Sequence, residues 1–420
     1  MPQLMRMQDR SMPRAALVVP LLVALLVTAC GSSTPPAAAS ATASAAPTTA
    51  ATAKPVVPGV TDTEVVVGSW GPQDGPAGAY GAIDRTIDAY FTMVNASGGI
   101  NGRKIRFIFE NDSYQPAKTV AAVKKLVEED KVFALVGGLG TAQNAAVMDY
   151  IVQNNVPHVW PATGTTALAV PLKKNVYAVQ LNYTTEATLA TQYALDTMGA
   201  KKIAVFYQND AFGKEGLDAV QAELKKRNLA AAAAVSYETA DTNFSAQALK
   251  LQTSGADTVI IYAVPKPGGS IIAEMGKIGY APKLLSSSVI NDPSIFQLAG
   301  SAINGMLIEA YLPAFDDTSN PKIVEYQAFM AKYAPKEQIG GFTESGYAYA
   351  QVFMEAMKRA GKELTREGFM QNLDQMKDFT GSLVPSLSYS ATDHAGVKAA
   401  YFQAAKDGKF VNVTGYITLK

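Results

Sequence analysis

The sequence predicts an α/β fold built as two lobes, each with a parallel sheet covered by helices. Short segments rich in β-branched residues alternate with amphipathic segments from residue 58 onward, and this alternation is typical of parallel sheets with helical crossovers. The alternation begins again near residue 183, which indicates a second lobe. The chain has 420 residues, of which 48% are hydrophobic, so it can bury two sizeable cores.

The first lobe is predicted from four segments with strand composition. These segments are 64–69, 104–110, 132–137 and 156–160. A helix is predicted over 80–94 because apolar residues recur there at helical spacing, and Gly98 and Gly99 follow as a stop signal. The order of strand, loop and helix repeats along this part of the chain, as expected for one α/β lobe.

The second lobe is predicted to begin with a helix over 184–198. Its strands are expected at 202–207, 231–237, 257–262, 283–286 and 306–310. The first strand of each lobe leads through a polar, glycine-containing loop to an aromatic residue and a glycine, namely Tyr80-Gly81 and Phe212-Gly213. If two such loops face each other at the carboxyl ends of their strands, both aromatic side chains reach into the cleft between the lobes. Alternatively, the similarity of the two loops is due to chance, because any strand-to-helix unit needs a turn.

Residues 1–29 are predicted to be a lipoprotein signal peptide. Three arginines precede an apolar run over 15–29 that is short for a membrane-spanning helix and is interrupted by Pro20. Small residues stand directly before Cys30, the only cysteine of the chain, so Cys30 is expected to be lipidated; the alternative is a free cysteine closing an anchor helix. Residues 30–58 consist mainly of Ala, Thr, Ser and Pro and are expected to form a disordered tether.

The composition argues against several classes of function. The 36 Lys and Arg residues balance 36 Asp and Glu residues, so the positive charge expected of a nucleic-acid-binding protein is missing. One cysteine and two histidines cannot build a disulfide framework or a His-rich metal centre. The sequence contains no nucleophile elbow, phosphate-binding loop or metalloprotease motif. We therefore expect a protein that is not an enzyme and that uses no metal or cofactor.

Two loops of small and hydroxyl-bearing residues are predicted at the carboxyl ends of neighbouring strands. The loop 136–144 places Gly140 and Thr141 at the start of a helix, where free N–H groups and the helix dipole can receive an anion such as a carboxylate. It lacks the third glycine of a dinucleotide-binding loop. The loop 161–166 is rich in threonine. Alternatively, the threonines of both loops only cap the helices that follow.

Several short motifs along the chain form a set that is typical of one protein family. They are Val65-Val66-Val67-Gly68, Gly71-Pro72, Gly75-Pro76, Tyr80-Gly81, Asn95-Ala96, Gly98-Gly99-Ile100-Asn101-Gly102, Asn111-Asp112-Ser113, Val136-Gly137-Gly138, Val156-Pro157 and Asp210-Ala211-Phe212-Gly213. Together with the signal sequence, residues 60–420 resemble the solute-binding proteins of bacterial ABC importers, specifically the leucine/isoleucine/valine-binding family.

The resemblance implies two doubly wound parallel-sheet lobes that are joined by three hinge crossings and close on a small ligand. The crossings are expected near 180–183, 311–314 and 382–385. The expected lobes are 59–182 with 315–380, and 183–313 with 385–420. The implied function is an extracytoplasmic receptor that is anchored at Cys30, acts as a monomer and delivers a small organic solute to an ABC permease. The alternative is a lipid-anchored sensing domain that signals through a membrane receptor.

The resemblance also implies which residues bind the ligand. In family members that bind amino acids, loop groups of the first lobe hold the ligand carboxylate. By position, these groups belong to Leu139, Gly140, Thr141, Ala142, Ala162, Thr163 and Gly164. Tyr80 and Phe212 would cover the ligand from two sides, and Trp70 would form the pocket floor. The contribution of the second lobe is expected from Val264, Pro265 and the loop 286–289, in particular Ser288.

One position departs from the family pattern. Ser288 stands where amino-acid-binding relatives place an acidic residue for the ligand ammonium, and a small register shift would bring Asp292 there instead. An ammonium buried without a carboxylate costs free energy. We therefore expect a carboxylate with an apolar or aromatic body rather than a simple branched-chain amino acid.

Overall fold

The first of two sheets has five parallel strands in the order β2-β1-β3-β4-β5. The computed structural model describes residues 56–419. The strands of this sheet are β1 (Glu64–Gly71), β2 (Lys104–Asn111), β3 (Ala134–Val136), β4 (His158–Val159) and β5 (Val176–Tyr177). Successive strands are added on one side of β1 and then on its other side, so the chain leaves β1 and β3 in opposite directions. The loops after these two strands therefore diverge and leave room for a ligand between them.

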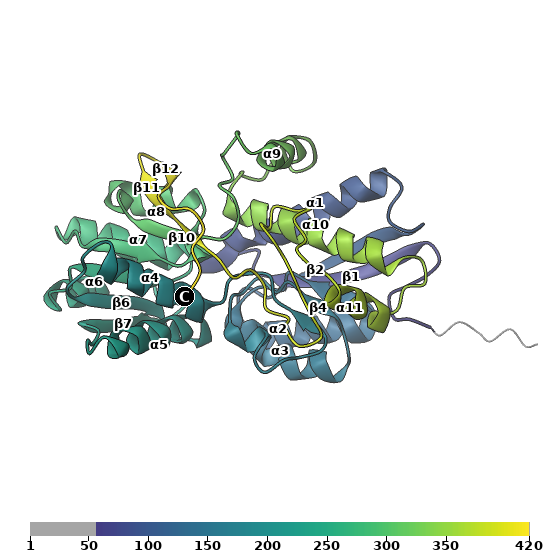
Figure 1. Cartoon of the computed structure of the whole chain (residues 1–420), viewed down its shortest axis with the longest axis horizontal. Coiled ribbons are helices and arrows are strands. Elements are labelled where there is room, and N and C mark those ends of the chain that lie inside the picture. The colour runs from purple at the N-terminus through teal and green to yellow at the C-terminus, as the bar shows by residue number, and fades with distance from the viewer. Residues whose placement is uncertain (1–55, 420) are drawn as a thin grey trace, which may run out of the picture. The chain divides into compact units, whose positions relative to one another are not determined.

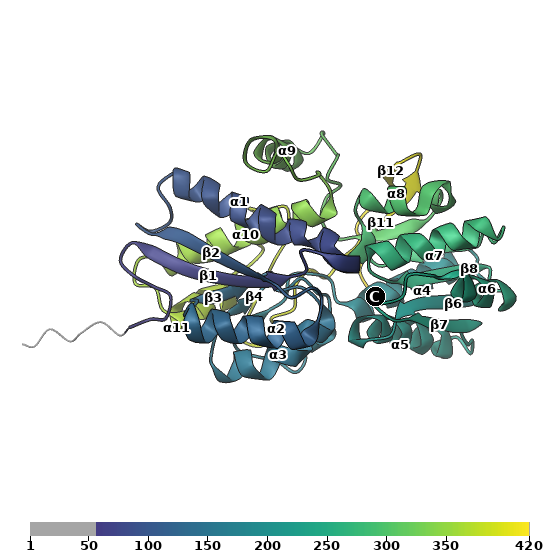
Figure 2. The same cartoon turned by 180° about the vertical axis from the view of Figure 1, so that it is seen from behind.

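Helices cover both faces of the first sheet. The helices α2 (Pro116–Lys124) and α3 (Thr141–Gln153) pack against each other on one face. On the other face α1 (Gly81–Ala96) packs against a helix that comes from much later in the sequence, α10 (Gly341–Ala360) (Figure 2). Two further helices belong to this lobe: α9 (Pro321–Tyr333) and α11 (Arg366–Asp374).

The second sheet has seven strands in the order β12-β11-β10-β9-β8-β6-β7. Five of them pair in parallel, whereas β11 and β12 are antiparallel to their neighbours. The strands are β6 (Ile203–Gln208), β7 (Ala233–Tyr237), β8 (Thr258–Tyr262), β9 (Lys283–Ser286), β10 (Leu307–Ala310), β11 (Tyr401–Lys406) and β12 (Lys409–Asn412). Its helices are α4 (Tyr183–Asp196), α5 (Ala211–Lys226), α6 (Ser245–Thr253), α7 (Pro265–Lys277) and α8 (Ser294–Ala299) (Figure 1).

The chain passes between the two lobes three times: between β5 and α4, after β10, and between α11 and β11. The third crossing lies further along the chain than the predicted 382–385. Tyr389 receives a hydrogen bond from Trp160 Nε1 at 2.9 Å, and the Val397 amide donates to the Val179 carbonyl at 2.9 Å. Residues 387–397 therefore still pack on the first lobe, and their assignment to the second lobe is wrong.

The N-terminal predictions fall outside the described part of the chain. The signal segment 1–29, Cys30 and the tether up to residue 55 are not among residues 56–419. Within residues 56–419, no helix combines the length and the apolar character needed to cross a membrane.

Candidate ligand-binding site

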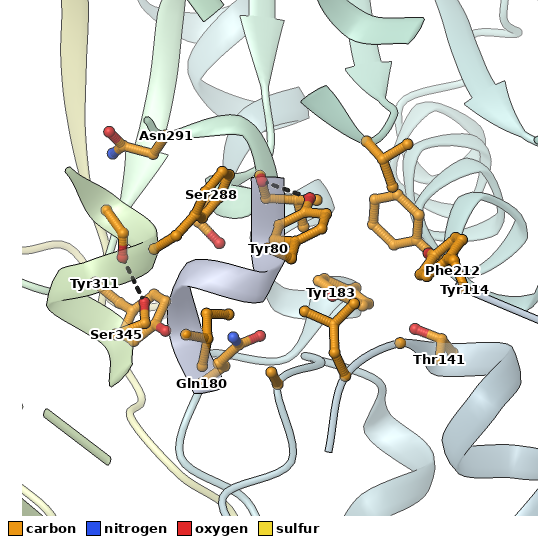
Figure 3. A pocket seen from close by; sticks show the side chains of 18 residues that line it. Tyr80, Tyr114, Thr141, Gln180, Tyr183, Phe212, Ser288, Asn291, Tyr311 and Ser345 are labelled. Carbon is orange, nitrogen blue, oxygen red and sulfur yellow. Dashed lines mark hydrogen bonds between the residues drawn. The ribbon is translucent and has the colours of Figure 1, made fainter. Parts of the chain in front are cut away.

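A cavity lies where the carboxyl ends of strands from both sheets meet. About 570 Å³ of space lies between its atoms, a figure that includes open solvent. None of its 18 lining residues is acidic, basic or histidine. The lining comprises Tyr80, Ile83, Tyr114, Leu139, Gly140, Thr141, Ala162, Gln180, Tyr183, Phe212, Val264, Ser288, Val289, Asn291, Tyr311, Gly341, Phe342 and Ser345 (Figure 3).

The start of α3 forms one end of this cavity. Gly140 has a φ of 99°, and a Cβ at this position would lie 2.1 Å from Gln143 Oε1, so the turn requires glycine. Asn144 Nδ2 donates to the carbonyls of Gly138 and Gly140, both at 2.8 Å, and thereby fixes the loop. The first amide groups of a helix have no partner within it, and those of α3 follow Gly140 at the cavity. This end can accept a carboxylate.

Aromatic side chains from both lobes form the walls. Tyr80 packs on Phe342 with 4.5 Å between ring centroids, and its hydroxyl donates a 2.8 Å hydrogen bond to the Val289 carbonyl of the second lobe. Phe212 is only 2% exposed and lies 5.0 Å from the ring of Tyr183. The Tyr80 hydroxyl thus connects the two lobes directly across the cavity.

Two cavity residues stand on the chain crossings. Gln180 lies on the first crossing, and its Nε2 donates to the Tyr349 hydroxyl at 2.8 Å. Tyr311 lies on the second crossing, and its hydroxyl is 3.1 Å from that of Tyr349. A ligand in the cavity therefore contacts the segments that must move when the lobes rotate.

Two buried carboxyl groups lie behind Ser288. The Ser288 hydroxyl donates to Glu186 Oε1 at 2.6 Å. Glu186 Oε2 and both oxygens of the neighbouring Glu309 lack hydrogen-bond partners among residues 56–419. Burial raises the pKa of each carboxyl, and the charge of Glu186 raises the pKa of Glu309 further. Both groups are held toward the neutral form.

The chain matches the family described as Periplasmic binding protein over residues 64–409. It belongs to that family. The match, the two parallel-sheet lobes and the relatives below confirm the predicted family, that of the leucine/isoleucine/valine-binding proteins, and its type I fold.

Three known proteins illustrate the relationship. The "Leu/Ile/Val-binding protein homolog 3" of Brucella melitensis is 27% identical over 353 residues, which are 83% of this chain and 94% of that protein. A substrate-binding periplasmic protein from Ralstonia solanacearum has a similar structure, with a TM-score of 0.77, 27% identity, and coverage of 84% of this chain and 99% of that one. A fatty acid ABC transporter substrate-binding protein from Thermomonospora curvata has a TM-score of 0.79, 21% identity and coverage of 87% and 95%.

In this periplasmic binding protein the cavity lining includes eight of the thirteen ligand-binding residues expected from the sequence. The eight are Tyr80, Leu139, Gly140, Thr141, Ala162, Phe212, Val264 and Ser288. The other five are Trp70, Ala142, Thr163, Gly164 and Pro265, which are not among the residues lining it. Thr163 and Gly164 instead line a neighbouring hollow near the chain crossings, and the Thr163 hydroxyl lies 2.7 Å from that of Thr141.

Trp70 is the clearest correction. The predicted pocket floor is a core residue with no exposed surface, and its ring stacks on His158 with 5.1 Å between centroids. Gly138 lies directly against the same ring. Asp292, the alternative acidic residue, also does not line the cavity. Its carboxylate accepts from the amide of Ser294 at 3.0 Å.

Val289, from the predicted loop 286–289, also lines the cavity. Nine further lining residues were not among the predicted binding residues. They are Ile83, Tyr114, Gln180, Tyr183, Asn291, Tyr311, Gly341, Phe342 and Ser345. Gln180, Tyr183 and Tyr311 fall inside the predicted crossings, so their position at the hinge was a usable signal. Phe342 and Ser345 come from the start of α10, and no local pattern indicated that this helix end reaches the cavity.

Proposed function

We propose that this protein captures a small organic solute between its lobes and delivers it to an ABC permease. The observation that carries the proposal is the cavity itself, which is lined by both lobes and crossed by the hydrogen bond from Tyr80 to the Val289 carbonyl. A ligand that contacts both lobes favours the closed arrangement by its differential affinity for it. The permease can then distinguish loaded from empty protein by shape.

The lining supports an amino acid or a carboxylate-bearing compound with an apolar or aromatic body. The start of α3 offers amide donors and the Thr141 hydroxyl to a carboxylate, while Tyr80, Phe212 and Phe342 offer aromatic surface. The name of the Brucella melitensis relative refers to leucine, isoleucine and valine, and the Thermomonospora curvata protein is a fatty acid ABC transporter substrate-binding protein. Both names support solute transport. The compounds that they mention are carboxylates whose apolar parts differ widely in size.

The proposal includes a location. The apolar run over 15–29, the single cysteine Cys30 and the tether-like composition of 30–58 favour a protein anchored by lipid on the outer side of the cell membrane. A monomer suits its role of carrying one ligand to the permease. No bond is made or broken in the proposed cycle, and no cofactor takes part.

Thermal unfolding of the purified protein tests this function. The panel comprises branched-chain amino acids, aromatic acids, short dicarboxylates, fatty acids, amides and sugars. A ligand at roughly 100 times its dissociation constant should add about 2.7 kcal/mol of stability, which raises the midpoint by several degrees. Small-angle scattering should show compaction with the same compound. Chemical conversion of a bound compound, or the absence of any shift across the panel, would contradict the proposal.

A further inference from the structure

The cavity continues past Ser288 and Tyr311 into a smaller recess. About 320 Å³ of space lies between the atoms of the recess, open solvent included, and the recess shares Ser288, Asn291, Tyr311, Gly341 and Ser345 with the main cavity. In Figure 3 four of these residues gather at the end of the cavity away from Thr141 and Phe212. The recess therefore adjoins the end of the cavity that is opposite the start of α3.

The recess contains a carboxyl group that the main cavity lacks. Glu344 lines it, is only 3% exposed, and has no hydrogen-bond partner for Oε1 among residues 56–419. It stands in the first turn of α10, where the helix dipole favours a negative charge. A buried acceptor without a donor destabilises the empty protein, and a hydrogen-bond donor on the ligand would remove that cost.

Asn291, which also lines the recess, carries a second acceptor without a partner among the described residues. Asn291 Nδ2 donates to Gln403 Oε1 at 2.9 Å and to the Glu309 carbonyl at 3.3 Å, which assigns the amide orientation. Its Oδ1 is left buried and without a partner in the described chain. The recess thus holds two oxygen acceptors and no basic side chain, so it is chemically complementary to a group that donates several hydrogen bonds and carries positive charge.

We propose that Glu344 and Asn291 form a subsite for an amino group of the ligand. The inference rests on the proposed function and narrows it: the preferred solute carries a carboxylate at one end, held at the start of α3, and an ammonium at the other end, held by Glu344. The acidic partner of the ammonium is then Glu344 on α10 of the first lobe. Because Glu344 supplies the negative charge, a ligand with an amino group can bind even though Ser288 stands at the position where an acidic residue was expected.

The charges around Glu344 make its binding of a cation pH-dependent. Burial raises the pKa of Glu344 well above the usual value, and the nearby charge of Asp316 raises it further. The other titratable groups that interact with it are Tyr326, Tyr401 and Tyr416, which are uncharged at neutral pH because their own pKa values are raised by burial. Ionised Glu344 is the form that binds an ammonium, so the affinity for such a ligand should rise with pH until the amine itself loses its proton.

Matched pairs of compounds test the subsite. The pairs differ only in the amino group: γ-aminobutyrate against butyrate, δ-aminovalerate against valerate, and para-(aminomethyl)benzoate against para-toluate. Calorimetry on the full chain should show that at least one amino compound binds about tenfold or more tightly than its partner. Equal or tighter binding of all the amino-free acids would overturn the subsite but support the proposed function. Binding of no compound in these pairs or in the wider panel would contradict both.

Variants then assign the preference to Glu344. Glu344→Gln keeps the shape but removes the charge, and should weaken the amino compound about tenfold or more while leaving its amino-free partner unchanged. Glu325→Gln, the same change at an exposed position of α9, is the control and should bind as the wild type does. Unchanged amine affinity in Glu344→Gln would overturn the assignment. Should that variant fail to fold, the comparison within pairs on the wild type still decides whether an amino group is recognised.

Discussion

Thr166 Oγ1 donates a 2.6 Å hydrogen bond to Glu215 Oε1, joining the loop after β4 in the first lobe to α5 in the second. The Thr166 amide donates to the same oxygen at 2.8 Å, and Thr165 Oγ1 donates to Glu215 Oε2 at 2.7 Å. One carboxylate of the second lobe therefore receives three hydrogen bonds from the first. Together with the Tyr80 hydroxyl on the Val289 carbonyl, this contact holds the lobes together at the cavity.

Removing the Glu215 carboxylate should open the protein. In Glu215→Ala the hydroxyls of Thr165 and Thr166 lose their acceptor, so the closed arrangement loses hydrogen bonds to a charged group. Such bonds contribute roughly 1.5–3 kcal/mol each after exchange with water, and less where the group is partly exposed, as Glu215 is. We expect a larger radius of gyration than in the wild type when both proteins are measured by small-angle scattering with the same concentration of a compound that compacts the wild type. Asp218→Ala, an exposed change on the same helix, should leave the scattering unchanged. Identical curves for the Glu215 variant and wild type would show that this contact does not hold the lobes.

The Tyr80 hydroxyl should contribute to affinity separately from its ring. Tyr80→Phe keeps the packing on Phe342 but removes the hydrogen bond to Val289, a loss of about 1 kcal/mol, or about fivefold in affinity. Tyr80→Ala also removes buried aromatic area and should weaken binding further. Calorimetry with the compound that gives the largest midpoint shift measures both effects. Tyr90→Phe on α1, which is outside the cavity lining, is the control; equal affinities for Tyr80→Phe and wild type would contradict the role of the hydroxyl.

A methyl group at position 138 should disrupt the first lobe. A Cβ on Gly138 would lie 2.3 Å from the ring of Trp70, which is fully buried and cannot move without repacking the core. We expect Gly138→Ala to lower the free energy of unfolding by about 2 kcal/mol or more. Gly268→Ala on α7, where the nearest atom to a new Cβ would be 3.4 Å away, should be neutral or slightly stabilising. Chemical denaturation of the two variants makes the comparison, and equal stabilities would refute this explanation of the glycine.

The buried Glu186–Glu309 pair should make stability depend on pH. A glutamate whose pKa is raised on folding keeps its proton longer in the folded chain than in the unfolded chain, where the pKa is about 4.3. Below about pH 4 the glutamate is protonated in both states, so its burial does not reduce the free energy of unfolding. As the pH rises through the folded-state pKa, the unfolded chain ionises first and the free energy of unfolding falls. Glu309→Gln cannot ionise, so its free energy of unfolding should fall less between about pH 5 and pH 8 than that of the wild type. Glu129→Gln, an exposed change, should follow the wild-type curve, and parallel curves for all three proteins would rule the pair out as the cause.

Local patterns predicted the elements that carry strong periodicity or turn residues. The strand at β1, the helix that follows Tyr80 and the glycine turn before Thr141 were all visible, because β-branched runs and helix-start signals act over a few residues. Parallel sheets converge at the carboxyl ends of their strands, so the loop at Gly140 could be placed at the site from sequence.

The remaining features depend on distant packing. Trp70 is the penultimate residue of β1, a strand that is buried on both faces, so alternation cannot tell which of its side chains faces a cavity. The Trp70 ring packs into the core because Gly138 has no side chain to occupy that space. The β5 strand has only two residues, Val176 and Tyr177, too few for a pattern. The third crossing was placed too early because the packing of Tyr389 on Trp160 involves residues far apart in sequence.

The interleaving of the two lobes has a consequence for how the chain acquires its structure. The first lobe needs α10 against α1, and the second needs β11 against β10. During synthesis, a chain that has emerged as far as residue 310 contains every parallel strand but neither finished lobe. Both lobes therefore reach completion only after the C-terminal quarter has been made, and proteolysis at a single site should yield no pair of fragments in which each holds a whole lobe.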